Sequence, residues 1–272
     1  MTRLQQRLGA LRSAGRKALV PFITAGDPSL AATVPVMHAL AEAGADVIEL
    51  GVAFSDPMAD GPVIQRSSER ALLRGAGLRY VLDCVRSFRE RDEATPVVLM
   101  GYLNPVEIRG VATFAADAAE AGVDGVLLVD LPPEEADEYR AAFRHHSLAL
   151  ISLASPTTPQ ARLERLCAQA DGYLYYVSFA GVTGADRLDV SDAGQRLQQL
   201  RSLGPAPVFA GFGIRDAVSA RAMAEHADGV VVGSALVSAL AGSVDADEAA
   251  TRAAAFLRPL RMALDSPAVV AA

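Results

Sequence analysis

Two carboxylates lie close together in the stretch IELGVAFSDPMADGP at residues 48–62. Glu49 stands inside an apolar run, and Asp60 ends the polar loop that follows it. A carboxyl group in apolar surroundings has a raised pKa unless its charge is stabilised, and it can then donate a proton near neutral pH. The pair therefore predicts general acid–base chemistry. A structural interpretation stays open, in which Glu49 is a paired buried acid and Asp60 caps a helix that begins near Pro62.

Glycine-rich turns follow two apolar runs near the C-terminus, FAGFGIRDA at 209–217 and DGVVVGSALV at 228–237. Glycine lets the backbone approach a ligand closely, and the N–H groups at a helix start favour an anion. Glycine turns often only reverse the chain, but two of them at consecutive late strand ends indicate a phosphate site. The candidates are Gly211, Phe212, Gly213, Gly233 and Ser234, joined by Thr183 and Gly184 from the segment FAGVTGADR at 179–187.

Short apolar runs alternate with amphipathic segments along the chain and predict the elements that position these residues. Continuous apolar runs are typical of strands covered on both faces in a parallel sheet. Eight strand–helix units predict an α/β protein, a closed (β/α)8 TIM barrel, with its chemistry at the C-terminal strand ends. An open doubly wound sheet is the alternative, but TAGDP after the first run lacks that fold's glycine fingerprint. The runs cover 18–25, 46–51, 96–101, 124–130, 148–152, 172–178, 206–211 and 228–233.

The whole chain, 1–272, is expected to form one barrel domain. Its core is predicted over about 17–260, after an extra N-terminal helix over about 2–14, and a frayed tail is expected over about 265–272. The opening segment MTRLQQRLGALRSAGRK is basic and lacks acids, which is also typical of a transit peptide. Its leucines repeat at helical spacing, so we expect a packed amphipathic helix instead.

Composition and charge exclude several classes of function. The net charge is −7 without any block of like charges, which argues against nucleic acid and anionic membranes as partners. Cys84 and Cys167 are far apart and are expected to be buried thiols of a cytoplasmic protein. The four histidines show no ligand spacing, so no metal is expected. Lys17 is the only lysine and precedes the first strand, which leaves none at a strand end for an imine-forming aldolase.

A set of motifs, in this order along the chain, resembles the tryptophan synthase alpha chain family: LVPFITAGDP, ELGVAFSDPMADGPVIQ, PVVLMGYLNPV, VDLPPEEA, AGVTG, GFGI and GSALV. The resemblance covers roughly residues 4–260. It implies a lyase of tryptophan biosynthesis that cleaves indole-3-glycerol phosphate to indole and glyceraldehyde 3-phosphate in a retro-aldol reaction. Glu49 would then move the protons, including protonation of carbon 3 of the indole ring. Asp60 would hold and polarise the indole N–H as positive charge develops.

The same resemblance implies a binding site for the substrate. Thr183 would reach toward Asp60 when its loop closes and excludes water. The phosphate would rest on Gly184, Gly213, Gly233 and Ser234. The indole pocket would be formed by Phe22, Met100, Leu127, Val129, Leu153, Tyr175 and Phe212, although barrel core is the other interpretation of each of these side chains.

The family usually works with a beta chain that binds pyridoxal phosphate and receives indole through a tunnel, so an α2β2 heterotetramer is expected and no cofactor is assigned to this chain. The sequence departs from the family at Ala53, where proline is common, at Val129 and at Phe179. These departures place the coupling to the partner in question. The implied contact comprises Ala53, Asp56, Pro57, Tyr102, Asn104, Pro105, Asp130 and Pro132.

Three functions remain as hypotheses. The first is an alpha-chain lyase that feeds a beta chain. The second is a free-standing lyase that releases indole without a beta chain. The third is a catalytically weak subunit that activates a beta chain allosterically, and the presence of both Glu49 and Asp60 argues against it.

Overall fold

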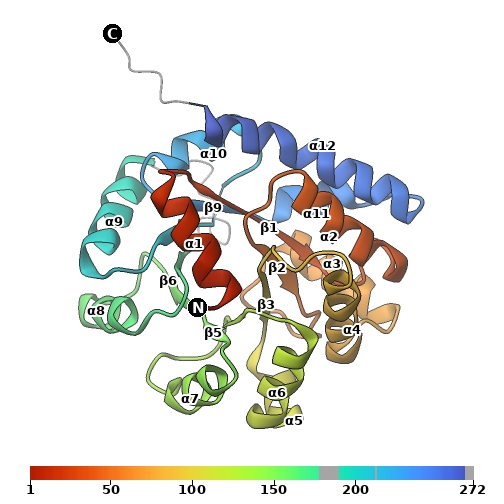
Figure 1. The fold of residues 1–272 in the computed structure, drawn as a ribbon, viewed down its shortest axis with the longest axis horizontal. Helices are drawn as coiled ribbons and strands as arrows, with labels where there is room; N and C mark the ends of the chain where they lie inside the picture. The colour runs from red at the N-terminus through yellow and green to blue at the C-terminus, as the bar shows by residue number, and fades with distance from the viewer. Residues whose placement is uncertain (178–189, 212, 267–272) are drawn as a thin grey trace.

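The computed structural model describes residues 1–177, 190–211 and 213–266, which form a ring of helices around parallel strands (Figure 1). The strands are β1 (Ala18–Thr24), β2 (Ile48–Gly51), β3 (Val97–Gly101), β4 (Gly125–Leu128), β5 (Ala149–Leu150), β6 (Ser152–Ala154), β7 (Leu174–Tyr176), β8 (Val208–Ala210) and β9 (Gly229–Val232). The helices are α1 (Arg3–Ser13), the 3-10 turn η1 (Leu30–Ala32), α2 (Thr33–Glu42), α3 (Pro62–Leu73), α4 (Leu78–Arg89), α5 (Leu103–Arg109), α6 (Val111–Ala121), α7 (Asp137–His145), α8 (Gln160–Gln169), α9 (Val190–Leu203), α10 (Ala217–Ala224), α11 (Ser234–Leu240) and α12 (Ala246–Asp265).

The sheet closes on itself through a single strand that is interrupted at Ile151. The strand order is β5-β4-β3-β2-β1-β9-β8-β7-β6, so the two edge strands are consecutive in the chain. Ile151 N donates to Val126 O at 2.9 Å on the β4 side, and Val177 N donates to Ala154 O at 2.9 Å on the β6 side. The strand predicted over 148–152 therefore passes from one neighbour to the other, and the predicted eight strands are observed as nine segments. The TIM-barrel prediction is confirmed, and the open sheet is excluded.

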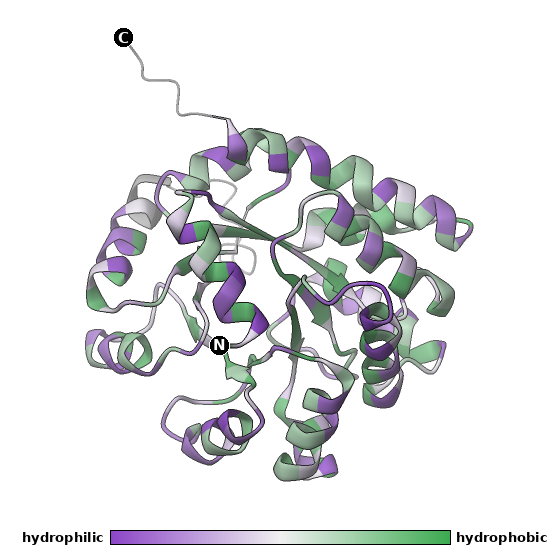
Figure 2. Ribbon diagram, in the orientation of Figure 1, coloured by the Kyte–Doolittle hydropathy of each residue, from purple (hydrophilic) through white to green (hydrophobic). Residues whose placement is uncertain are grey.

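Alternate residues of each strand point into the barrel, because side chains of a strand alternate between its two faces. The inward residues include Val20, Val98, Leu127, Phe209 and Val231, which form one buried apolar cluster. The outward residues form a second, larger cluster with the surrounding helices. Figure 2 shows this arrangement as hydrophobic strands at the centre and helices whose polar residues lie outward. Both cysteines are buried and free.

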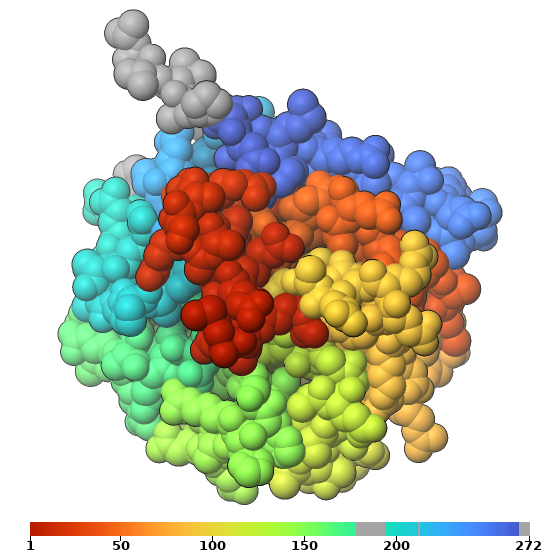
Figure 3. Space-filling view, in the orientation of Figure 1, coloured from red at the N-terminus to blue at the C-terminus, as the bar shows by residue number. Residues whose placement is uncertain are grey.

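Helix α1 covers the N-terminal face of the barrel, as Figure 3 shows at the centre of the view. Thr2 and Gln5 form a capping box that starts the helix. Leu4 and Leu11 are buried against the inward cluster of the barrel. The N-terminal helix predicted over about 2–14 is therefore present and packed. In the part of the chain that the structure describes, no helix is both long and apolar enough to cross a bilayer.

Three aspartates that directly precede or begin strand segments tie neighbouring strands together. The side chains of Asp46, Asp124 and Asp228 accept hydrogen bonds from the backbone N–H groups of Leu19, Val97 and Val208 at 2.9, 2.8 and 3.0 Å. Each carboxylate also pairs with an arginine, and two of these arginines, Arg3 and Arg7, lie on α1. The same aspartates therefore fix the strand starts and hold α1 in place.

Candidate active site

Glu49 is the only charged side chain among the inward residues of β2, and it is completely buried. Its strand register places it beside Phe22 of β1 and Val98 of β3. The Tyr173 hydroxyl donates to Glu49 Oε1 at 2.7 Å, whereas Oε2 has no partner among the described residues. Burial raises the pKa of Glu49 to about 7, and the bond from Tyr173 acts in the opposite direction. The sequence prediction of a raised pKa is confirmed.

Asp60 lies in the loop between β2 and α3, where the Tyr102 hydroxyl donates to its Oδ2 at 3.0 Å. The same hydroxyl accepts a bond from Ala59 N at 3.0 Å, so Tyr102 holds this part of the loop. Burial raises the pKa of Asp60 to about 6, against the effect of the Tyr102 bond. The helix-cap interpretation is wrong, because Gly61 is the N-cap residue of α3 and no side chain caps it.

A cavity of about 310 Å³ opens at the C-terminal ends of the strands beside Glu49. Three glycines, Gly211, Gly213 and Gly233, line it and leave room because they carry no side chains. At Gly211 a Cβ atom would lie 2.0 Å from Cε2 of Tyr175, so only glycine lets that ring lie against the strand. The cavity brings together eight of the predicted residues: Phe22, Glu49, Met100, Tyr175, Gly211, Gly213, Gly233 and Ser234.

Asp60 does not line this cavity, but Tyr175 connects it electrostatically to Glu49. The pKa of the buried Tyr175 hydroxyl is held well above its usual value by burial, then by the charges of Glu49 and Asp60. A single hydroxyl thus lies within the electrostatic range of both carboxylates. A molecule that occupied the cavity would lie beside Glu49 and Tyr175, which both line it.

Three predicted pocket residues lie elsewhere in the barrel. Leu127 is fully buried in the inward cluster, where it is the register partner of Met100 on the neighbouring strand. Val129 and Leu153 are partly buried and line a neighbouring cavity of about 280 Å³ together with Asp130 and Pro132. Thr183, Gly184 and Phe212 lie outside the described residues, as does Phe179.

Four of the predicted phosphate residues, Gly211, Gly213, Gly233 and Ser234, line the cavity. Gly213 adopts a positive φ of 65°, which glycine tolerates without strain. Gly233 immediately precedes α11, so the first N–H groups of that helix face this end of the barrel. Arg215, which the sequence patterns did not indicate, also lines the cavity and adds a positive charge near these turns. Within the ranges that the structure describes, no group of three or more His, Cys, Asp or Glu side chains is arranged to hold a metal ion.

Comparisons with known proteins agree on one family. The sequence profile of the tryptophan synthase alpha chain family matches residues 8–264. An alpha chain from Xanthomonas oryzae is 70% identical over 266 residues, which cover 97% of this chain and 99% of the relative. One from Xanthomonas campestris is 68% identical over 271 residues, 98% and 100% of the two chains.

Solved structures give the same result. The alpha subunit of tryptophan synthase from Legionella pneumophila superposes with a TM-score of 0.91 at 45% identity, covering 97% of this chain and 99% of that one. A chain of tryptophan synthase from Mycobacterium tuberculosis superposes with a TM-score of 0.85 at 34% identity, covering 97% and 100%.

This chain belongs to the tryptophan synthase alpha chain family. The family expected from the motifs is confirmed, and with it the activity of a tryptophan synthase alpha chain, the cleavage of indole-3-glycerol phosphate to indole and glyceraldehyde 3-phosphate.

In this tryptophan synthase alpha chain, the residues predicted to contact a partner follow β2, β3 and β4, at the end of the barrel opposite α1. Asp56, Asn104 and Asp130 are exposed or partly exposed, and Pro57, Pro105 and Pro132 are partly exposed. Asp130 also accepts a bond from Leu103 N at 2.8 Å, which joins two of these loops. Ala53 and Tyr102 are different, because Ala53 is buried against Ala71 and Ala76, and the buried Tyr102 faces Asp60.

Sequence reasoning missed Tyr173 as part of the site. It precedes β7 and lies two residues before Tyr175, so both rings point into the barrel. The two-residue spacing of these tyrosines within GYLYYVS was the sequence feature that could have indicated Tyr173. The hydrogen-bond partner of Tyr173 could not be predicted from local sequence, because Glu49 is 124 residues away in the chain.

Proposed function

We propose that Glu49 transfers the protons of the cleavage and that Asp60 holds the indole nitrogen. The observation that carries this proposal is the unequal environment of the two Glu49 oxygens. Oε1 accepts the bond from Tyr173, and Oε2 has no partner among the described residues. Glu49 itself lines the cavity. A buried carboxyl group with a pKa of about 7 exists in both protonation states near neutral pH, so it can both donate and accept a proton.

The proton movements balance with Glu49 as the shuttle. Protonated Glu49 donates to carbon 3 of the indole ring, which places positive charge on the ring nitrogen. The bond between carbon 3 and the glycerol side chain then breaks, and its electron pair restores the indole ring. The hydroxyl on the adjacent side-chain carbon loses its proton to the Glu49 carboxylate and becomes the aldehyde of glyceraldehyde 3-phosphate. Asp60 stabilises the charge on the nitrogen, which is greatest in the protonated intermediate.

The glycine turns and the start of α11 are proposed to bind the substrate phosphate. Gly213, Gly233 and Ser234 lie on the same cavity as Glu49, which supports a substrate that reaches from the acid to these turns. Backbone N–H groups at a helix start favour a phosphate group. Phe22, Met100 and Tyr175 supply apolar surface for the indole ring on the same cavity.

The experiment is indole release from indole-3-glycerol phosphate by the purified chain. Glu49→Gln and Asp60→Asn are each expected to reduce the rate by at least about 10²-fold, since a positioned acid or base typically contributes about 10²–10⁴. Asp56→Asn is the matched control for Asp60→Asn, because Asp56 is an exposed acid of the same loop. Full activity of Glu49→Gln would contradict the assignment.

We infer that a beta chain is the partner of this alpha chain. The exposed loops after β2, β3 and β4 support this inference, and another cavity of about 780 Å³ lies between Phe54–Met58 and α3 on the same side. Slow indole release by the chain alone and a sharp increase on adding a beta chain are expected. Fast indole release whose rate does not change when a beta chain is added would favour the free-standing lyase. An α2β2 assembly and a cytoplasmic location stay predictions.

A further inference from the structure

The N-terminal segment carries a surplus of positive charge that the lyase reaction does not use. Its five basic residues are Arg3, Arg7, Arg12, Arg16 and Lys17, and it contains no acid. Arg3, Arg7 and Arg16 form ion pairs with Asp124, Asp46 and Asp265. Arg12 and Lys17 form none within the described part of the chain.

Arg12 and Lys17 are bound only to neutral carbonyl groups among the described residues. Arg12 Nη2 donates to Pro205 O at 2.5 Å, and Lys17 Nζ donates to Ala227 O at 2.7 Å. A carbonyl oxygen satisfies one donor but leaves the positive charge unpaired. Among the described residues, both cations therefore lack an ion-pair partner on a protein whose net charge is −7.

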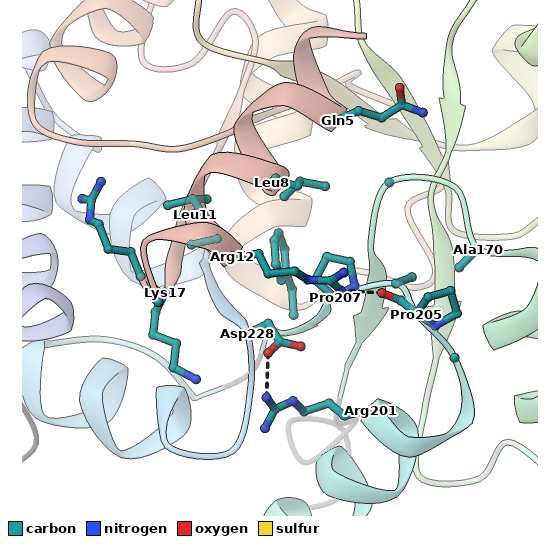
Figure 4. Close-up of a pocket in the computed structure, with 18 residues that line it drawn as sticks. Gln5, Leu8, Leu11, Arg12, Lys17, Ala170, Arg201, Pro205, Pro207 and Asp228 are labelled. Carbon is teal, nitrogen blue, oxygen red and sulfur yellow. Dashed lines mark hydrogen bonds and ion pairs between the residues drawn. The ribbon is translucent and has the colours of Figure 1, made fainter. Parts of the chain in front are cut away.

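Both cations line one cavity of about 700 Å³ on the N-terminal face of the barrel, which we name the basal cavity (Figure 4). It lies between α1, the 204–207 turn and the start of β9, and its volume is within the range of small-molecule sites. Leu8, Pro207 and Phe209 contribute apolar surface to the same cavity. The basal cavity thus combines apolar walls with unpaired positive charge.

Asp228, the acidic residue that lines the basal cavity, does not neutralise the charges of Arg12 and Lys17. Asp228 pairs with Arg201 at 2.9 Å and also accepts the N–H of Val208. Burial lowers the pKa of Lys17, the charge of Asp228 opposes this effect, and Arg201 adds to it. The protein surroundings therefore leave the Lys17 ammonium short of negative charge, which a bound anion would supply.

We propose that the basal cavity binds a small organic anion, whose acidic group pairs with Lys17 and Arg12 and whose apolar body lies against Leu8, Pro207 and Phe209. This site is separate from the Glu49 cavity, which opens at the opposite end of the strands. Two stacked rings link them, because Phe209 of the basal cavity lies 4.4 Å from Tyr173 between ring centroids, and Tyr173 donates to Glu49. The ligand class is a carboxylate or phosphate monoester with a compact apolar body.

The single lysine makes the test specific to this place in the molecule. Reductive methylation with ¹³C-formaldehyde keeps the amine charge and gives nuclear magnetic resonance signals from only Lys17 and the terminal amine. Benzoate and phenyl phosphate serve as probes, and neutral benzamide is their uncharged counterpart. Saturable movement of the Lys17 signal by either anion, together with a higher pKa for Lys17, is the expected result. The terminal amine signal is expected to stay in place.

Substitutions on α1 and just after it separate the proposed site from general effects of the anion. Arg12→Gln is expected to weaken binding about tenfold, because a hydrogen bond to a charged group typically contributes about that factor. Arg16→Gln is the matched control, since Arg16 lines the same cavity but is already paired with Asp265. Equal movement of the Lys17 signal with benzamide, no saturation by either anion, or unchanged binding in Arg12→Gln would overturn the proposal. Indole release by each variant shows that its fold is intact.

Discussion

At Glu49, one hydrogen bond sets both the orientation of the carboxyl group and part of its acidity. Tyr173 donates to the charged form, so it lowers a pKa that burial raises. Tyr173→Phe is therefore expected to raise the pKa that governs kcat/KM above the value of about 7 for Glu49. The pH dependence of indole release measures this shift. Tyr80→Phe is the control, because Tyr80 bonds to Leu30 O and Thr33 far from Glu49. A kinetic pKa that moves downward in Tyr173→Phe would contradict this account.

The buried charge of Glu49 also has a cost in stability that depends on pH. Its pKa is about 7 in the folded chain, against 4.5 for a glutamate exposed to water, as in the unfolded chain. Between these values the folded state holds more protons than the unfolded state, so the free energy of unfolding falls as pH rises through this window. The loss amounts to about 3 kcal/mol at pH 8, since one pKa unit corresponds to about 1.4 kcal/mol.

Glutamine at position 49 carries no charge at any pH, so the free energy of unfolding of Glu49→Gln should not fall with pH for this reason. We expect the variant to exceed the wild type in the free energy of unfolding by up to about 3 kcal/mol at pH 8, with a smaller difference at pH 5. Urea unfolding of both proteins at the two pH values measures it. An advantage of the same size at pH 5 and pH 8 would rule out ionisation of Glu49 as its source.

Residue types in the local sequence were enough to single out Glu49, because a carboxylate in an apolar run is unusual wherever it occurs. Asp60 was singled out by its position in the polar loop that follows this run, and its role by the family resemblance. Their partners Tyr173 and Tyr102 could not be found in this way. The barrel must close before Tyr173 meets Glu49, and the loop after β2 must fold back before Tyr102 meets Asp60. The local sequence shows which residues are unusual, but the tertiary fold determines which groups form hydrogen bonds with them.

At the scale of elements, the contribution of an aspartate before a strand to stability depends on which hydrogen bonds its side chain accepts. Asp46 accepts the Leu19 N–H and pairs with the buried Arg261, which pairs with Asp265 as well. Asp46→Asn therefore removes one of the two carboxylates that compensate Arg261. A loss of about 2 kcal/mol in the free energy of unfolding is expected, somewhat less than the ~3 kcal/mol or more that follows when a buried charge loses its whole partner. Asp171→Asn is the matched control at the equivalent position before β7. Among the described residues, Asp171 accepts no strand N–H, and of its two arginine partners Arg144 is exposed whereas Arg140 is buried.

Chemical unfolding of the two aspartate variants measures the difference. A smaller loss is expected for Asp171→Asn, because part of its ion pairing is with solvent-exposed groups. Equal losses would mean that the bond to the strand N–H and the buried arginine add nothing beyond an ordinary ion pair.

The elements themselves were largely predictable, and the exceptions have physical causes. All eight apolar runs contain observed strands, because buried parallel strands need continuous apolar sequence. The break at Ile151 was not predicted, since it marks where one strand changes neighbours and its residues remain apolar throughout. The start of α3 was predicted near Pro62, but its N-cap is Gly61, because the side chain of Asp60 is bonded to Tyr102 instead.

For the whole molecule, the two ends of the barrel have opposite characters. The N-terminal end is covered by α1 and is rich in positive charge. The C-terminal end is open around Glu49, and the loop after β2 presents Met58, whose side chain is 86% exposed. Leu73, whose side chain is 82% exposed, lines the same cavity as Met58, and apolar side chains exposed together are a feature of protein contact sites. A beta chain is therefore expected to bury Met58, while α1 stays free.

Met58→Ser tests this assignment of the two ends. Burial of a methionine side chain contributes about 1.5–3 kcal/mol, so the beta-chain concentration for half-maximal activation of indole release should rise about tenfold or more. Release without a beta chain should change little, because Met58 does not line the Glu49 cavity. Val244→Ser is the matched control, with the same 86% exposure but a position between α11 and α12. If both variants respond alike to the beta chain, the contact surface lies elsewhere than the loop after β2.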